Sequence, residues 1–218
     1  MPRTSAEVVE ELWQSALADA GIDADDAILI TFDGQPPDGF PGAISWRRHS
    51  DIEDPAEMAA MGERLEDLNS DRVRQLRRVV AWTDRTTTGL AAVLRHELEH
   101  THQLELYDAE LVDLHRDGVR LIGRHAGGIT GNAVIYNQMP MEADANAAGA
   151  RFARSRFGDD AVDRLVAGKD GDSNTLRPTW DPQPLDTLLE RMKEWVAVTG
   201  PELAKAFAAR HRPSVESS

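Results

Sequence analysis

The sequence contains no cysteine and has few cations for its length. The absence of cysteine excludes disulfide bonds and thiolate metal ligands, and it is compatible with an oxidising or a reducing compartment. The 218 residues include 24 Lys and Arg against 38 Asp and Glu, which gives a net charge of −14 at pH 7. Because nucleic acids and anionic membranes bind clustered Lys and Arg, we expect neither as a partner.

Long apolar runs are also missing. Acidic residues interrupt the apolar positions of residues 1–20, so we expect neither a signal peptide nor a membrane span there. A cytoplasmic location is the default expectation. The length suits one compact domain over residues 1–218, with 211–218 as a frayed tail, and the sequence leaves the oligomeric state open.

The run His96-Glu97-Leu98-Glu99-His100 is the most informative feature that is present. Residues four apart lie one turn apart on the same face of a helix, so His96 and His100 can hold one metal ion between them. A catalytic zinc keeps three protein ligands and one position for water, whose pKa it lowers to about 7. Glu97 is then placed to act as the general base. The alternative is that both histidines are surface residues of an ordinary amphipathic helix.

The sequence around this motif predicts a helix that follows a buried strand. Residues 78–83 form a short strand pattern, and Asp84 to Thr88 supply turn and N-cap residues. Apolar residues then recur at helical spacing: Leu90, Val93, Leu94, Leu98, Thr101 and Leu104. The motif therefore lies in the middle of a predicted helix, where a metal site needs it.

The third ligand must come from elsewhere in the chain. The metzincin pattern is excluded, because Gln103 and Leu106 stand where it has glycine and a third histidine. His102 points about 200° around the helix from His100, so it is expected to be a surface or supporting group.

A second helix is predicted from Met139 to Phe157, with Gly158 as its C-cap. Its small residues favour a close approach to the first helix: Ala143, Ala147, Ala148, Gly149 and Ala150. That approach would bring Glu142 or Asp144 toward the two histidines. We prefer Glu142, with Asp144 as the alternative third ligand.

Together these residues resemble the zincin metallopeptidases, in particular the glutamate-ligand gluzincins of the ImmA/IrrE type. The resemblance covers about residues 77–157 and includes Glu142, Ala145 and Asn146 of a Glu-x-x-Ala-Asn stretch. It implies an α+β fold with a small mixed sheet, and an HExxH helix followed by a helix that carries the last ligand. It also implies that Asn146 orients a histidine and that Tyr136 donates a hydrogen bond to the oxyanion. Residues 132–136 could equally form a strand with a packed aromatic; His115, His125 and Arg151 are the other candidate donors.

The leading hypothesis is therefore a zinc-dependent peptidase that acts on a protein or peptide. Its zinc ligands would be His96, His100 and Glu142, and its catalytic residues Glu97 and Tyr136. The alternatives are a zincin scaffold that binds metal or a partner without cleavage, and an interaction protein whose motif is accidental. Two imidazoles and a carboxylate also suit manganese or iron.

The remaining patterns predict the rest of the fold. We expect strands at 27–32 and 43–47, a turn-rich loop at 33–42, and a loop at 168–184. Helices are expected at 5–20, 54–68, 159–167 and 185–210, the last with a possible break at Gly200-Pro201. The basic run 72–78 is expected to be a solvated face.

Overall fold

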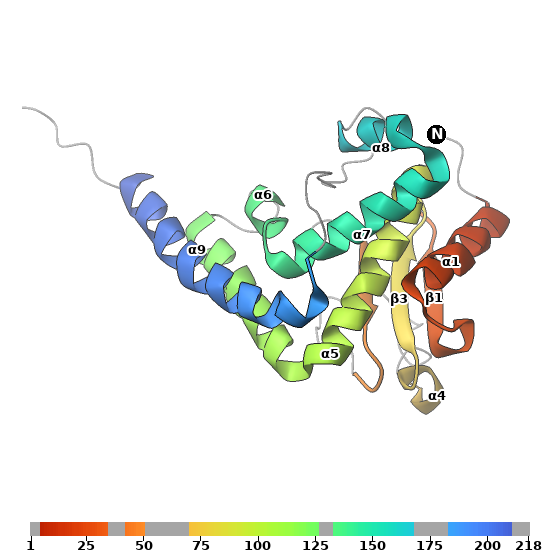
Figure 1. The fold of residues 1–218 in the computed structure, drawn as a ribbon, viewed down its shortest axis with the longest axis horizontal. Coiled ribbons are helices and arrows are strands. Elements are labelled where there is room, and N and C mark those ends of the chain that lie inside the picture. The colour runs from red at the N-terminus through yellow and green to blue at the C-terminus, as the bar shows by residue number, and fades with distance from the viewer. Residues whose placement is uncertain (1–4, 35–41, 51–69, 127–132, 168–182, 211–218) are drawn as a thin grey trace, which may run out of the picture.

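The chain has an α+β fold, as predicted, in which helices pack against one face of a mixed three-stranded sheet (Figure 1). The computed structural model describes residues 5–34, 42–50, 70–126, 133–167 and 183–210. The predicted helix at 54–68, most of the two predicted loops, the tail 211–218 and the side chain of His125 lie outside these residues.

The sheet has the order β1-β3-β2, with β1 at Ala27–Phe32, β2 at Ala43–Trp46 and β3 at Arg77–Trp82. Strand β1 pairs with β3 in parallel, and β2 pairs with β3 antiparallel. The predicted strands are confirmed to within one residue at each end. Central β3 is almost wholly buried, which fits its run of apolar residues.

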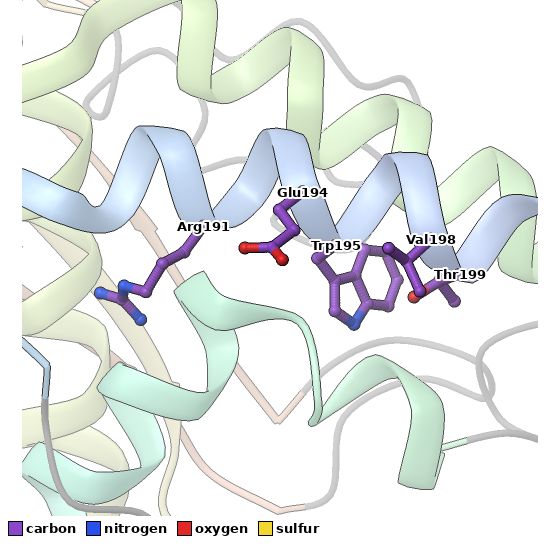
Figure 2. Close-up of a pocket in the computed structure, with 5 residues that line it drawn as sticks. All are labelled: Arg191, Glu194, Trp195, Val198 and Thr199. Atoms are coloured by element: carbon purple, nitrogen blue, oxygen red, sulfur yellow. The ribbon is translucent and has the colours of Figure 1, made fainter.

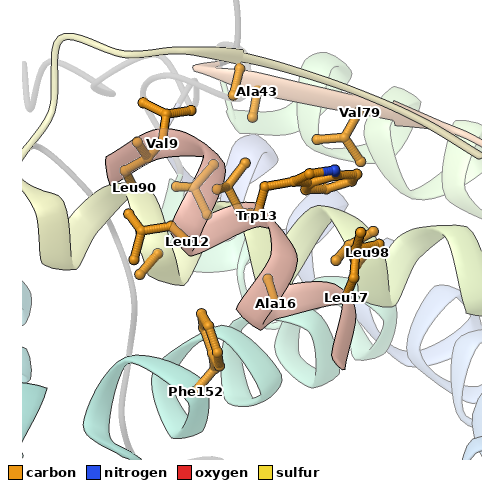
Figure 3. Close-up of a cluster of buried hydrophobic side chains, with 14 of the residues drawn as sticks. Val9, Leu12, Trp13, Ala16, Leu17, Ala43, Val79, Leu90, Leu98 and Phe152 are labelled. Carbon is orange, nitrogen blue, oxygen red and sulfur yellow. The ribbon is translucent and has the colours of Figure 1, made fainter. Parts of the chain in front are cut away.

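Alternate residues of β3 serve two separate apolar clusters, because side chains along a strand point to opposite faces. Val79 and Ala81 join the main core with helix α1 (Ala6–Ala20) and helix α5 (Thr87–Ala126), part of which is drawn in Figure 3. Val80 and Trp82 face the other way and pack with Trp46. The main core thus fixes α5, and the metal-binding motif with it, against one face of the sheet.

Helix α1 confirms the sequence prediction at both ends. The Ser5 hydroxyl accepts a hydrogen bond from the Val8 amide, and Gly21 ends the helix with a left-handed φ of 67°. Its buried face carries Leu12, Trp13 and other residues of the main core. Helix α1 therefore covers the sheet beside α5 (Figure 1).

Helix α5 begins with Thr86 as a cap, since the Gly89 amide donates to the Thr86 hydroxyl. It extends far beyond the predicted apolar stripe and bends sharply near its middle (Figure 1). We call residues 87–104 the first arm and residues 111–126 the second arm. The second arm runs beside helix α9 (Leu188–Arg210) and buries Leu111 and Ile122 against Met139 and Met192.

The described residues contain four further α-helices and two 3₁₀ helices, the latter at Ala24–Asp26 and Leu185–Thr187. Helix α7 (Pro140–Phe157) ends at Gly158, as predicted, and α8 (Asp159–Val166) follows it directly. Helix α6 (Ala133–Tyr136) replaces the strand considered for this stretch, and α4 (Asp71–Arg74) precedes β3. Figure 1 shows α7 crossing the first arm of α5, an approach that brings the candidate site together.

Two expectations were wrong. Helix α9 continues through Pro201 without a break. Gly200 packs against Leu121 of the second arm. The basic run 72–78 is not wholly a solvated face, because Arg78 is fully buried in β3. Its guanidinium donates hydrogen bonds to the backbone and hydroxyl oxygens of Ser50 and lies 5.9 Å from the centre of the Trp46 ring.

Candidate metal centre

The first arm of α5 places His96 and His100 side by side on one face, as their spacing requires. Their Nε2 atoms lie 2.9 Å apart, and the two rings meet edge-on with centroids 4.5 Å apart. Both side chains are largely buried. The motif therefore presents two imidazole nitrogens to one point inside the protein.

Glu142 reaches that point from the first turn of α7. Its Oε2 lies 3.6 Å from His96 Nε2, and its Oε1 lies 3.6 Å from His100 Nε2. A helix N-terminus also favours a carboxylate electrostatically. The approach of the helices depends on Gly149, since a Cβ there would lie 2.3 Å from the backbone oxygen of Ala92.

Each histidine is held on its outer side by a polar residue. The Gln103 Oε1 lies 2.8 Å from His100 Nδ1, while the Gln103 amide donates to the backbone oxygen of Met141. Asn146 hydrogen bonds to the His96 side chain and donates to Asn137 Oδ1. The resemblance predicted such a role for Asn146. Both Nε2 atoms face Glu142, and the contact of Gln103 with Nδ1 fixes that orientation for His100, as metal-ligating histidines need.

The three side chains fit a divalent metal ion. One ligand atom from each of His96, His100 and Glu142 lies within 4.8 Å of the others. In a tetrahedral zinc site with Zn–N bonds of 2.0–2.1 Å, two ligand nitrogens are about 3.3 Å apart. The observed spacings need shifts of only a few tenths of an ångström, so the cluster could hold a metal ion.

The electrostatics of the cluster favour a cation. Burial raises the pKa of Glu142, but His100 and the neighbouring histidines outweigh it and hold that pKa well below its usual range. Burial likewise opposes the charged form of His100, but the carboxylate of Glu142 raises the pKa of His100 overall. Burial and the charge of His100 lower the pKa of His96. A buried carboxylate that stays anionic thus lies beside the two imidazoles and stabilises a positive charge there.

Glu97 lies in the same buried region, on the side of the edge strand β2. Burial raises the pKa of Glu97 to about 6, and the charge of His100 and a hydrogen bond with Ser45 act against that shift. Its side chain is nearly inaccessible to solvent. A carboxylate with a raised pKa in a closed site is typical of a general base.

Tyr136 and His115 also contact the carboxylate of Glu142. The Tyr136 hydroxyl donates to Glu142 Oε1 at 2.7 Å, and burial raises the pKa of this phenol well above its usual value. His115 Nε2, from the second arm of α5, lies 3.5 Å from the same oxygen and 3.5 Å from the Tyr136 hydroxyl. The structure therefore places both residues at the cluster.

Asp144, the alternative third ligand, is engaged elsewhere. Its carboxylate accepts two hydrogen bonds from the Arg191 guanidinium of α9, with Nη1 at 3.2 Å and Nη2 at 2.5 Å. Arg151 is exposed on α7. The electrostatic neighbours of His102 are Glu99, Arg77, Arg95 and Glu105, all outside the His96–His100–Glu142 cluster. The geometry thus brings Glu142, and not Asp144, to the histidines.

Arg191 also borders a hollow of about 270 Å³ along α9 (Figure 2). The other residues that line it are Glu194, Trp195, Val198 and Thr199. None of them belongs to the histidine and glutamate cluster. The hollow therefore touches the site only indirectly, through the ion pair of Arg191 with Asp144.

The sequence did not predict the contacts that Gln103 and His115 make at the site. Gln103 stands three residues after His100, a spacing that places it on the same helix face and could have indicated its contact. His115 was considered only as an oxyanion donor, and no local pattern indicates its approach to Glu142. That approach depends on the bend of α5.

No protein-family model matches the chain, and neither a curated protein nor a solved structure matches it. The fold and the site therefore define its class: an α+β protein with a buried His-His-Glu cluster that could hold a metal ion. Within the described part of the chain, every helix is too short or too polar to span a lipid bilayer.

Proposed function

We propose that the protein is a zinc-dependent peptidase. The observation that carries this proposal is the convergence of His96, His100 and Glu142 within 4.8 Å, with Glu97 buried alongside. Three ligands from nitrogen and oxygen leave room for one more group, which is the arrangement of a hydrolytic zinc site. A purely structural zinc site would use four protein ligands and would have no use for Glu97.

Zinc in this site would supply Lewis acidity, lowering the pKa of a bound water and polarising the scissile carbonyl. Glu97 would accept the proton from the attacking water and later deliver it to the departing amine. Its raised pKa suits both steps, since the carboxylate can gain and lose a proton near neutral pH. Ser45 would hold the Glu97 side chain in position meanwhile.

Tyr136 would stabilise the developing oxyanion. Its hydroxyl is kept protonated by burial and already points into the cluster, toward Glu142 Oε1. A donor of this kind typically contributes about 3–4 kcal/mol to the transition state. The substrate would be a protein or a peptide, and the cytoplasm is the location that we predict for the reaction.

The experiment compares Glu97→Gln with Glu99→Gln in the same motif. Glu99 lies on the same helix but pairs with Arg95 at 2.9 Å, outside the metal cluster. Both variants should retain zinc, because neither removes a ligand. Hydrolysis of a mixed peptide library, followed by mass spectrometry, should fall about 10²–10⁴-fold in Glu97→Gln and stay near wild type in Glu99→Gln.

Equal cleavage by Glu97→Gln and the wild type would contradict the assignment of the general base. A wild type that contains zinc but yields no new peptide termini from the library or from denatured protein would contradict the peptidase proposal. It would favour the alternative of a metal-binding protein on a zincin scaffold.

A further inference from the structure

His115 has no part in the proposed mechanism, yet it lies beside two residues that do, Glu142 and Tyr136. Its Nε2 is 3.5 Å from Glu142 Oε1 and 3.5 Å from the Tyr136 hydroxyl. The rings of His115 and Tyr136 meet edge-on, with centroids 6.1 Å apart. The His115 side chain is half-buried, so these contacts are partly protected from water.

The bend in α5 is what brings His115 to the site. In a straight helix with a rise of 1.5 Å per residue, His96 and His115 would lie about 28 Å apart. Instead both contact the carboxylate of one residue, Glu142. Both arms of α5 therefore contribute a histidine that contacts Glu142 in the first turn of α7.

Packing of the second arm holds His115 in this place. Gly118, one turn after His115, allows the close approach of Met139 and Trp195. A Cβ at Gly118 would lie 2.7 Å from Met139 Cε and 3.1 Å from Trp195 Cζ3. Met139 directly precedes α7 and is fully buried. The turn of the second arm that follows His115 thus packs closely against the residue that precedes α7.

The two oxygens of Glu142 have different surroundings. Oε1 accepts the hydrogen bond from Tyr136, faces His115 and lies 3.6 Å from His100 Nε2, whereas Oε2 lies 3.6 Å from His96 Nε2. We infer that His115 is a positioning residue that holds Glu142 Oε1, so that the carboxylate stays directed at the metal position between His96 and His100. The inference rests on the proposed zinc site.

This role follows from what Tyr136 has to do. If the Tyr136 hydroxyl turns to a substrate oxyanion, Glu142 Oε1 loses its short hydrogen bond inside a buried site. His115 then remains as the donor on that oxygen. Carboxylate ligands are commonly held by such outer hydrogen bonds, and loss of one typically weakens metal binding about 10–100-fold.

The test measures zinc affinity by competition with a chromophoric chelator in wild type, His115→Gln and His115→Asn. Glutamine can place its amide near the position of the histidine Nε2, whereas asparagine is too short to reach Glu142. We expect wild-type affinity, within about threefold, for His115→Gln and an affinity about tenfold weaker for His115→Asn. His102→Asn serves as the control, because His102 lies on the same helix and outside the cluster.

The absorption spectrum of the cobalt-substituted protein gives a second readout that does not depend on activity. His115→Asn should change the ligand-field bands, and His115→Gln should restore them. Equal zinc affinity and equal spectra in wild type, His115→Gln and His115→Asn would overturn the role of His115 alone. Equal losses in His115→Gln and His115→Asn would also overturn it, since they would indicate a role in packing. A wild type that binds no zinc would instead remove the proposed function.

Discussion

The buried leucines in the two arms of helix α5 belong to different apolar clusters, but the two arms meet at one carboxylate. The first arm packs Leu90, Leu94 and Leu98 into the main core with α1 and the sheet. The second arm packs Leu111 and Ile122 with residues that flank and form α7 and α9. The first arm brings the two histidines of the motif to Glu142, and the second brings His115. The site is therefore a junction of two packing units, although the HExxH motif lies wholly within the first arm.

The two arms meet at Glu142, so its substitution should have the largest effect on zinc affinity. Glu142→Gln keeps the shape of the side chain but removes its charge, and we expect zinc affinity to fall more than about 100-fold, beyond the loss of an outer contact. Asp144→Asn, two residues away, breaks the ion pair with Arg191 and should leave zinc affinity nearly unchanged. Chelator competition measures both. Weaker zinc binding in Asp144→Asn than in Glu142→Gln would move the third ligand to Asp144.

Truncation of a buried leucine in each arm tests whether the two clusters fold as one unit, as the predicted single domain requires. Leu98 and Leu111 are both fully buried. Leu98→Ala and Leu111→Ala should each lower the free energy of unfolding by about 2–5 kcal/mol. Thermal unfolding followed by circular dichroism should show one transition that both variants shift by roughly 4–20 °C. Two transitions, each shifted by one variant, would mean that the arms unfold independently.

A pair of glycine substitutions distinguishes the tight contact of the first arm from the open surface of the second. Gly149→Ala would force α7 away from Ala92, and we expect it to cost about 1–3 kcal/mol of stability and to weaken zinc binding. Gly123 lies exposed on the second arm, where a Cβ would meet nothing within 4 Å. Gly123→Ala should therefore stabilise the protein by up to about 1 kcal/mol through helix propensity. Urea denaturation measures the two changes in stability, and a parallel zinc titration measures the effect on zinc binding. A destabilised Gly123→Ala together with an unaffected Gly149→Ala would contradict the close packing of α7 on the first arm.

The sequence predicted the first arm and its surroundings well, because their signals are local. Strand β3, the cap near Thr86 and the motif lie within one stretch of chain, and the small residues of α7 indicated a close helix contact. The choice between Glu142 and Asp144 stayed open, since both lie in the first turns of α7. The structure separates them, because Glu142 contacts both histidines while Asp144 pairs with Arg191, far along the chain.

The second arm could not be predicted in the same way. No proline or glycine in residues 101–114 marks the bend of α5, so no local signal indicates that the helix changes direction. The contact of His115 with Glu142 joins residues from two helices, so periodicity within either helix does not reveal it. The burial of Arg78 depends similarly on Ser50 and Trp46, which come from other segments.

Metal content tests the central claim most directly. Elemental analysis of protein purified without added metal would compare the wild type with a variant that carries both His96→Ala and His100→Ala. We predict about one zinc per chain in the wild type and essentially none in the variant. No metal in either protein, even after zinc is supplied, would contradict the metal site and the peptidase proposal with it.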